Sequence, residues 1–447
     1  MSPTEDRSTE YLTAPIDPTS AERLAASGLE LATVDTSDRA AFGRWFQAEA
    51  RGFHDTTLPD KSVDEKLPGL AHRRSTGVWD STAADAASPV ATVSSWPVAL
   101  SVPGEKSVEA WAISAVTVSP THRRRGIARA LLESELRTAD ALGVPLAVLT
   151  VSEATIYSRY GFAPTTRTAD LKIDTARAKW TGPVATGRVH FVQPETLREL
   201  GHELVERVRL TTPGQIHFDQ NLWLRLLGLL GEPTDDTRKL RTVRYDDENG
   251  EPQGFAVFTV TETGASFSAH TLDVKYLVSA TDDAYAGLWR FIVEMDLVSE
   301  VTAHLRAADE PLPWLVEDNR AIAFGRAHDH LWARILDVPA ALTARTFSAG
   351  GDIVLEITDP LGFAEGTFLL SVDAAGDATV IGLEGDAPAD AAVIALSVNE
   401  LGALYLGATA ATTLARAGRI VEKTPGAASA VDAAFRSTRA PWLSIWF

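Results

Sequence analysis

The sequence predicts a mixed α/β (α+β) fold divided into several domains. The chain has 447 residues, which is too long for one ordinary hydrophobic core, and 45% hydrophobic residues indicate a globular protein. Short apolar strand patterns alternate with amphipathic helix patterns along the chain. The G-x-G-x-x-G, Walker and G-x-S-x-G signatures are absent from the sequence, so a doubly wound dinucleotide-binding sheet is not predicted.

One stretch, residues 119–128, organises the first part of the chain. An apolar run from Trp111 to Val118 precedes it, which predicts a strand. A helical stripe follows it, and Gly143 stands where that helix would end. The stripe consists of Ala128, Leu132, Leu136 and Ala139. We therefore expect a strand, a tight basic turn and a helix.

This turn has the chemistry of an anion site. The N–H groups at a helix N-terminus lack intrahelical acceptors and carry partial positive charge, so a phosphate or pyrophosphate would be stabilised there. Gly126 and Ala128 allow close approach to the backbone, and Arg123, Arg124 and Arg125 supply forked donors. A basic surface turn without a ligand is the alternative that these residues leave open.

The neighbouring strands complete one sheet. Residues 29–34 predict a first strand, and Phe42, Trp45, Phe46 and Ala50 form a helical stripe after it. Residues 88–102 and 107–118 predict a hairpin joined near Pro103-Gly104, and residues 144–151 predict a buried strand. We expect a strand at 170–173 to close this unit.

The pattern then partly repeats. Gly182-Pro183 marks a boundary, after which residues 240–245, 254–261 and 270–278 predict strands and residues 285–292 a helix. In place of the basic turn stands the segment 279–283, where Asp282 and Asp283 would repel a pyrophosphate. A third unit begins near residue 330, with strands at 352–357, 366–371 and 378–382 and a helical stretch at 401–407.

Composition limits the partners. A net charge of −19 disfavours nucleic acid, which needs a basic face, and is compatible with a cationic small molecule, although acidity for solubility alone explains it equally well. Without cysteine the chain has no disulfide, zinc–thiolate site or acyl-cysteine relay.

No apolar run is long enough to span a bilayer, and the polar start predicts a mobile arm at 1–21 without an export signal. His328-x-His330 lacks a third ligand at a recognisable spacing, so no metal is predicted.

Two motifs carry a resemblance to a known family. Arg123-x-x-Gly126-x-Ala128 resembles the acetyl-CoA loop of the GCN5-related N-acetyltransferases, and Tyr157 before Gly161-Phe162 resembles the late motif of that family. With Ser152-Glu153 and the aromatic chain end, the sequence resembles the Eis (enhanced intracellular survival) acetyltransferases over nearly its whole length. The resemblance implies a catalytic acetyltransferase domain at 22–185, a degenerate one at 186–325 and a sterol-carrier-protein-2-like domain at 326–447.

The resemblance also implies site residues. Around CoA it places Val116, Val118, Arg123, Arg124, Gly126, Ile127, Ala128 and Ser152. In the acceptor pocket it places Phe53, Asp55 and Trp446, and Asp55 could hold a substrate ammonium or be only a turn or capping residue. Thr150 stands where some relatives carry His, and Trp446 where some carry Glu, so we expect its substrate range to differ from theirs.

The acid and the base complete the expected site. Tyr157 is the expected general acid, because a phenol is protonated at neutral pH; a packed aromatic side chain is the alternative. The chain ends in Pro441-Trp442-Leu443-Ser444-Ile445-Trp446-Phe447, an apolar end that should be buried with its α-carboxylate turned inward. In the resembling family that carboxylate is the base and Phe447 matches its position; a terminus that only plugs a core is the alternative.

These features together predict an acetyl-CoA-dependent N-acetyltransferase without a metal. Its expected acceptors are primary amines of aminoglycosides, polyamines or lysine side chains. A non-catalytic CoA- or lipid-binding regulatory protein on the same scaffold is the alternative. The resemblance further implies a homohexamer, and the sequence predicts a cytoplasmic protein.

Overall fold

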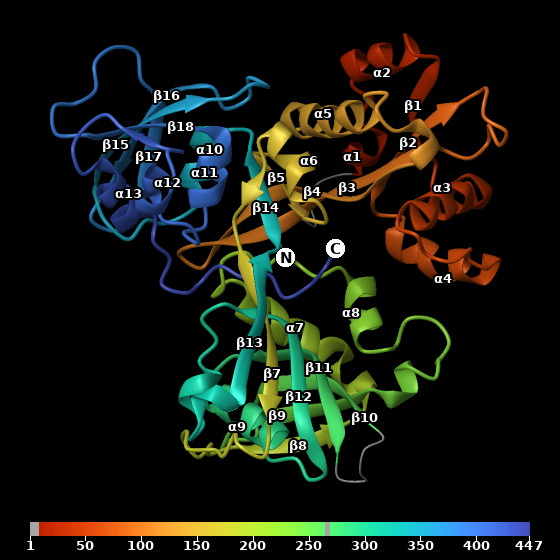
Figure 1. Ribbon diagram of the computed structural model, residues 1–447, viewed down its shortest axis with the longest axis vertical. Coiled ribbons are helices and arrows are strands. Elements are labelled where there is room, and N and C mark those ends of the chain that lie inside the picture. Colours follow the sequence, from red (N-terminus) through yellow and green to blue (C-terminus); the bar gives the residue numbers. More distant parts are fainter. Residues whose placement is uncertain (1–8, 264–268) are drawn as a thin grey trace. The chain divides into compact units, whose positions relative to one another are not determined.

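The computed structural model describes residues 9–263 and 269–447, which form two compact units (Figure 1). The first unit contains residues up to 165 together with 331–437 and Phe447. The second contains residues 166–330 and 438–446. Neither unit is continuous in sequence, and each is described by itself below.

The first sheet has seven strands in the order β1-β2-β3-β4-β5-β14-β6. Its strands are β1 (Leu29–Thr33), β2 (Arg74–Asp80), β3 (Ala91–Val102), β4 (Lys106–Val118), β5 (Leu146–Thr150), β6 (Ala163–Pro164) and β14 (Leu331–Ile335). All neighbours pair antiparallel except β4 and β5, which are parallel and joined through helix α5 (Ile127–Ala141). Trp111, Leu132 and Leu136 are fully buried between α5 and the sheet, so the predicted strand, turn and helix are confirmed.

The helices α3 (Arg39–Gly52) and α4 (Asp60–Leu70) pack a separate cluster onto this sheet. The stripe predicted from Phe42, Trp45 and Phe46 is buried there together with Val63. The N-cap of α3 is Asp38, whose side chain accepts from the first N–H groups of the helix.

The segment 9–21 is not a loose arm, so that part of the predicted 1–21 arm is wrong. It contains α1 (Glu10–Thr13) and the start of α2 (Pro18–Ala25). The hydroxyl of Tyr11 donates to the carbonyl of His72 at 2.5 Å, and Arg137 donates to Asp17 at 2.7 Å. Leu24 is 1% exposed. These anchors join residues far apart in the chain, which a local polarity pattern cannot indicate; residues 1–8 lie outside the described residues.

The second sheet also has seven strands, in the order β13-β7-β12-β11-β10-β9-β8. They are β7 (Arg167–Asp174), β8 (Arg188–Val192), β9 (Arg241–Asp246), β10 (Pro252–Glu262), β11 (His270–Ser279), β12 (Val298–Ala307) and β13 (Ile322–Asp329). Here β11 and β12 are the parallel pair, joined through α9 (Asp282–Val293), so the second half repeats the arrangement of β4, α5 and β5. Helices α7 (Leu197–Arg209) and α8 (Gln220–Leu226) precede β9.

Two strands lie in sheets other than those expected. The strand predicted at 170–173 does not close the first unit; β7 lies between β13 and β12 in the second sheet. Conversely β14, expected to open the third unit, pairs with β5 and β6 of the first sheet. Strand partners are decided by long-range pairing, and the local pattern of each segment fits either sheet equally well. The domain boundaries predicted at 185/186 and 325/326 stay predictions.

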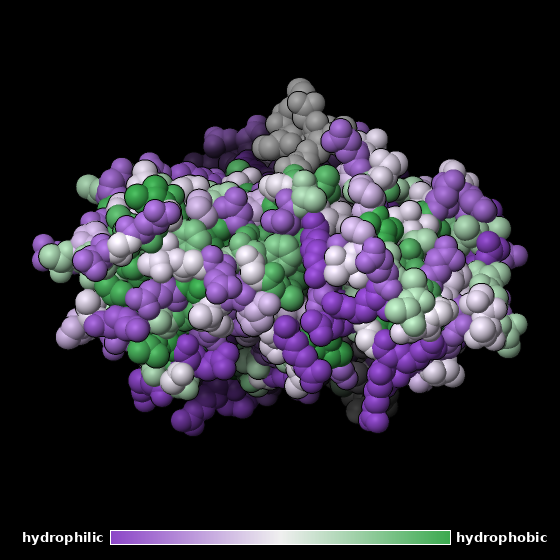
Figure 2. Space-filling view, turned by 90° about the horizontal axis from the view of Figure 1, so that it is seen from above, coloured by the Kyte–Doolittle hydropathy of each residue, from purple (hydrophilic) through white to green (hydrophobic). Residues whose placement is uncertain are grey.

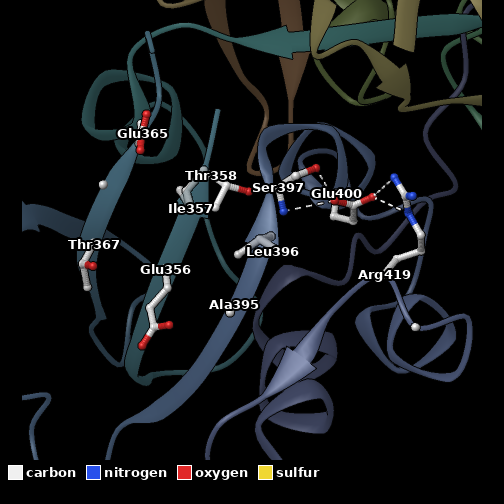
Figure 3. Close-up of a pocket in the computed structure, with 12 residues that line it drawn as sticks. Glu356, Ile357, Thr358, Glu365, Thr367, Ala395, Leu396, Ser397, Glu400 and Arg419 are labelled. Atoms are coloured by element: carbon white, nitrogen blue, oxygen red, sulfur yellow. Dashed lines mark hydrogen bonds and ion pairs between the residues drawn. The ribbon is translucent and has the colours of Figure 1, made fainter. Parts of the chain in front are cut away.

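The remaining part of the first unit carries a five-stranded sheet in the order β17-β16-β15-β18-β19. The strands are β15 (Gly351–Thr358), β16 (Gly366–Val372), β17 (Ala378–Gly382), β18 (Ala392–Ser397) and β19 (Val421–Glu422), with helices α10 (Val338–Thr343), α11 (Val398–Leu404), α12 (Ala411–Arg416) and α13 (Ala427–Phe435). The three strands predicted here are confirmed. An open groove of about 590 Å³ crosses this sheet, and in Figure 3 Glu400 links Ser397 to Arg419 beside it.

The surface mixes polar and apolar residues. On the face seen in Figure 2, hydrophobic side chains form small patches separated by hydrophilic ones. Within residues 9–263 and 269–447, no helix has the length and apolar character to cross a bilayer.

Candidate active site

The site begins where β4 and β5 separate. These parallel strands are paired only at Trp111 with Ala147 and at Ala112 with Val148. Beyond these pairs β4 continues to Val118 and β5 to Thr150 without further pairing between them. Unpaired backbone groups of diverging strands can bind an extended ligand, because their N–H and C=O groups still need partners.

A bulge marks β4 at this point. Its partner β3 pairs Thr92 with Thr117 and Ser94 with Ser114, which leaves Ala115 and Val116 unpaired in the register. Ala115 has a φ of 55°, and Thr92 Oγ1 donates to its carbonyl at 2.8 Å, fixing the bulge. Bulges re-aim backbone groups, so amides at Val116 and Val118 can turn toward a carbonyl placed between the strands.

The basic turn is held from one side by Asp80. Arg125 and His122 each contact Asp80 Oδ2 at 3.2 Å, and Arg125 also donates to the carbonyl of Ser27 at 3.0 Å. The hydroxyl and N–H of Thr82, followed by Arg125, keep the pKa of Asp80 well below its usual range. Of the three arginines, Arg125 is therefore structural, which the sequence alone does not reveal.

Arg123 and Arg124 are free for a ligand. Both are exposed, and neither forms a hydrogen bond or ion pair with any residue that the structure describes. Gly126 has a φ of 75°, and a Cβ there would meet nothing within 4 Å. No side chain caps α5, whose first hydrogen bond runs from Ala130 N–H to the Gly126 carbonyl at 3.0 Å. Open space, uncapped N–H groups and two free guanidinium groups fit a pyrophosphate.

The expected cofactor residues differ in what they can offer. Ile127 is 2% exposed and lies in the core, so only its backbone N–H faces the turn. Ala128 is half-buried and small, which leaves room above the helix. Val116 and Val118 are half-buried and pack at the edge of the core.

Tyr157 lies at the end of α6 (Ala154–Tyr157), just after β5. It is 6% exposed, and its ring packs edge-to-face against Phe162. Burial raises the pKa of the phenol, partly offset by a hydrogen bond with the side chain of Ser152. A phenol that is held neutral and directed toward the end of β5 can supply a proton there.

Two side chains from residues 331–437 of the same unit hold the loop after Tyr157. Asn399 Nδ2 donates to the carbonyl of Ser158 at 2.9 Å and to that of Phe162 at 2.8 Å. Arg334 donates to the Tyr160 carbonyl at 3.1 Å and forms a buried ion pair with Asp359 at 2.6 Å. Sequence reasoning missed these residues, because nothing near Asn399 in the chain points to Tyr157.

The last residue of the chain lies beside β5. Thr150 Oγ1 donates to the terminal oxygen of Phe447 at 3.2 Å. The Phe447 ring packs edge-to-face on Trp96, with centroids 5.8 Å apart, and Arg73 lies 3.7 Å from the Trp96 centroid on that ring. The structure thus brings Phe447 and the loop of Tyr157 to the same end of β5.

The expected acceptor loop follows α3. Gly52 ends that helix so close to β4 that a Cβ would lie 2.4 Å from Thr117 Cβ. Phe53 is 47% exposed, and the exposed Asp55 carboxylate bonds to none of the residues that the structure describes, so it is not a capping side chain. Both are available to a ligand.

Trp446 belongs to the second unit. It is 52% exposed and packs edge-to-face on His330 at 4.4 Å. His330 is buried, and its Nε2 contacts the carbonyl of Ile445 at 2.7 Å, while burial lowers its pKa to about 4. A neutral His330 therefore donates its Nε2–H to the Ile445 carbonyl. Among the residues described, no three His, Asp or Glu side chains are grouped as at a metal site.

Family models match three successive parts of the chain. One described as an acetyltransferase (GNAT) domain matches residues 33–165, another of the same description matches 214–335, and a sterol carrier protein domain matches 338–444. An uncharacterized N-acetyltransferase of Streptomyces avermitilis is 33% identical over 419 residues, covering 92% of this chain and 96% of that protein. N-acetyltransferase Eis of Mycobacterium bovis is 34% identical over 348 residues, covering 76% of this chain and 81% of that protein.

The chain belongs to the Eis-like family of GNAT N-acetyltransferases. The crystal structure of Eis1 from Mycobacterium abscessus superposes with a TM-score of 0.78 at 29% identity, covering 94% of this chain and all of that one. The predicted family, the order of two GNAT domains and a sterol-carrier domain, and the enzyme class are confirmed. GNAT membership implies acetyl-CoA as the acyl donor.

Proposed function

We propose that this Eis-like enzyme transfers acetyl directly from acetyl-CoA to a primary amine of a cationic molecule. Aminoglycosides, polyamines and lysine side chains are the proposed acceptors. The observation that carries the proposal is the hydrogen bond of 3.2 Å between Thr150 and the terminal oxygen of Phe447, at the end of the strand beside the bulge. This hydrogen bond supports the proposal that the Phe447 carboxylate lies where the attacking amine would need a base.

Each of the chain's own groups has one task in this reaction. The Phe447 carboxylate accepts a proton from the attacking amine as the C–N bond forms and the C–S bond breaks. Tyr157 donates its phenolic proton to the departing sulfur. The unpaired amides of the β4 bulge stabilise the oxygen that becomes negative. Arg123, Arg124 and the uncapped start of α5 hold the pyrophosphate, which fixes the thioester between the strands.

The proposed preference for cations rests on charge. The chain carries a net charge of −19, which raises the local concentration of a cationic substrate. Asp55 supplies a free carboxylate on the loop after α3, and Phe53 on the same loop exposes an aromatic face for an ammonium. We also propose, from the family resemblance, that the enzyme forms a homohexamer and is cytoplasmic; light scattering after gel filtration measures the assembly.

A thiol-release assay tests the proposal. Purified enzyme with acetyl-CoA and a thiol reagent should release CoA with spermine, an aminoglycoside or a lysine peptide, and mass spectrometry should find one added acetyl group on the acceptor. Release with none of these amines, while calorimetry still shows acetyl-CoA binding, would instead favour a non-catalytic CoA-binding protein.

A further inference from the structure

The second GNAT domain keeps a cleft where the first has its expected cofactor site. Its parallel strands β11 and β12 are paired from His270 with Val298 to Val274 with Ala303, and then diverge. A cavity of about 550 Å³ lies beyond that point, lined by the ends of both strands and the start of α9. This is the position that the gap between β4 and β5 takes in the first domain.

The start of α9, beside this second cleft, is unsuited to bind an anion. Thr281 caps α9 by accepting from Ala284 N–H at 3.1 Å, so one of its free N–H groups is already satisfied. Asp282 and Asp283 occupy the first turn, and Asp283 accepts from Thr186. Two carboxylates at this helix end repel a pyrophosphate, so the cleft cannot hold CoA as the first one would.

The walls of this cavity suit the apolar part of a ligand. Val205, Val208, Ile216, Phe218, Leu277 and Trp442 line the cavity. Its buried charges are already paired, since Arg306 bonds to Glu310 at 3.1 Å and Arg209 to Glu206 at 2.9 Å. The volume lies in the range of pockets that enclose small organic ligands, which are mostly apolar with few polar groups.

The carboxylates at the lining point to a cation. Asp282 and Asp309 are exposed at the lining, where Asp309 Oδ2 also accepts from the Ala440 N–H at 3.2 Å, and Arg439 is the basic residue there without a partner among the described residues. Thr212 lines the cavity at 8% exposure, and its hydroxyl bonds to none of the residues that the structure describes. This hydroxyl can donate to or accept from a polar atom of a ligand in the cavity.

We propose that this cleft binds a cationic amphiphile, with its apolar body in the cavity and its ammonium group at Asp282 and Asp309. One wall is the segment of Trp442 and Ser444 that leads to Phe447, and Trp442 is fixed there by donating to the Leu305 carbonyl at 2.6 Å. The site is separate from the acetyl-transfer chemistry, because it needs neither CoA nor an acetylatable amine.

Calorimetry with decyltrimethylammonium below its micelle concentration tests the proposal on the full chain. This probe has no N–H and cannot be acetylated. We expect saturable binding to the wild type and at least about tenfold weaker binding of decanoate, which has a similar chain and the opposite charge. Absence of binding of the cation, or equal binding of decanoate, would overturn the proposal.

Variants locate the binding site. Ala280→Phe should fill the cavity and abolish binding, since Ala280 lines it and its backbone bond to Gln253 does not involve the side chain. Asp282→Asn with Asp309→Asn should weaken binding about three- to tenfold. Asp235→Asn with Asp236→Asn makes the same charge change on an exposed loop outside the lining and should leave binding unchanged.

The variants also decide the alternatives. Unchanged binding in both Ala280→Phe and the independent filling variant Ala307→Phe, each with a wild-type melting temperature, would contradict the cleft as the site. If Asp235→Asn with Asp236→Asn weakens binding as much as the rim pair, the attraction comes from overall charge, and the proposed site is wrong. Where one filling variant fails to fold, the other still decides.

Discussion

Thr150 and Phe447 are 297 positions apart in the chain, and the hydroxyl of the first donates to the terminal oxygen of the second at 3.2 Å. Two residues after Thr150, Ser152 bonds to the hydroxyl of Tyr157. One strand end thus holds the two groups that we propose as the acceptor and the donor of protons in acetyl transfer. The predictions below separate these two roles.

Extending the chain by one glycine after Phe447 should lower kcat by roughly 10²- to 10⁴-fold, because the extension replaces the carboxylate with an amide that cannot accept a proton. Thr150→Val should lower kcat about tenfold by loosening the terminus. Steady-state kinetics with spermine measures both, and a glycine added at the N-terminus is the control. A fully active extended enzyme would remove Phe447 from the mechanism.

Tyr157→Phe should lower kcat by roughly 10²- to 10⁴-fold while the Kd for acetyl-CoA changes by no more than a few-fold, since only the proton donor is removed. The matched control is Tyr160→Phe, which removes a phenol from the same loop. Since burial raises the pKa of Tyr157, activity that depends on this acid should persist above pH 10, the ordinary value of a phenol, and fall at a higher pH. Equal rates for Tyr157→Phe and the wild type would refute the assignment.

Asn399→Ala should lower kcat about tenfold with little change in KM, because the two carbonyls that Asn399 holds frame the loop of Tyr157. Asn399 is a positioning residue. The control Lys106→Met breaks an exposed ion pair with Asp377, which also links the first GNAT domain to the sterol-carrier-like part. If both variants change kcat equally, the effect is a general loosening of the unit.

Arg123→Ala and Arg124→Ala should each raise the KM for acetyl-CoA about three- to tenfold, and the effect should shrink at high salt. Arg125→Ala should instead lower the melting temperature, since Arg125 is bonded to Asp80 and to the Ser27 carbonyl. Kinetics at two salt concentrations together with thermal melting separates the cofactor-binding arginines from the structural one. An Arg125 variant that alters only KM would contradict this division.

His330 should make stability depend on pH. Burial lowers its pKa from 6.5 to about 4, so the folded state favours the neutral ring. Its stabilising contribution is fully present above pH 6.5 and is lost as the pH falls toward 4, by roughly 3 kcal/mol in all. Urea unfolding at pH 7.5 and pH 5 should show a smaller loss for His330→Gln than for the wild type, and equal losses would exclude His330 as the source.

The sequence pattern predicts correctly those elements that are decided by interactions between neighbouring residues. The basic turn, its helix and the carboxylates of the second turn could be predicted, because apolar periodicity and helix-end chemistry depend on neighbouring residues. Three arginines in a row look alike in sequence, yet Asp80 fixes Arg125 and leaves Arg123 and Arg124 free. The support of Tyr157 by Asn399 could not be predicted either, since a side chain that bonds distant carbonyls leaves no periodic signal.

The sequence by itself determined the family, the order of the three domains, the basic turn before α5 and the aromatic end of the chain. Only the tertiary structure decided which sheet receives β7 and β14, which arginines are free, and that Phe447 lies against Thr150. The physical reason is the range of the interactions. Helix ends, turns and amphipathic faces are fixed by residues a few positions apart, whereas strand pairing and the site's hydrogen bonds join residues hundreds of positions apart.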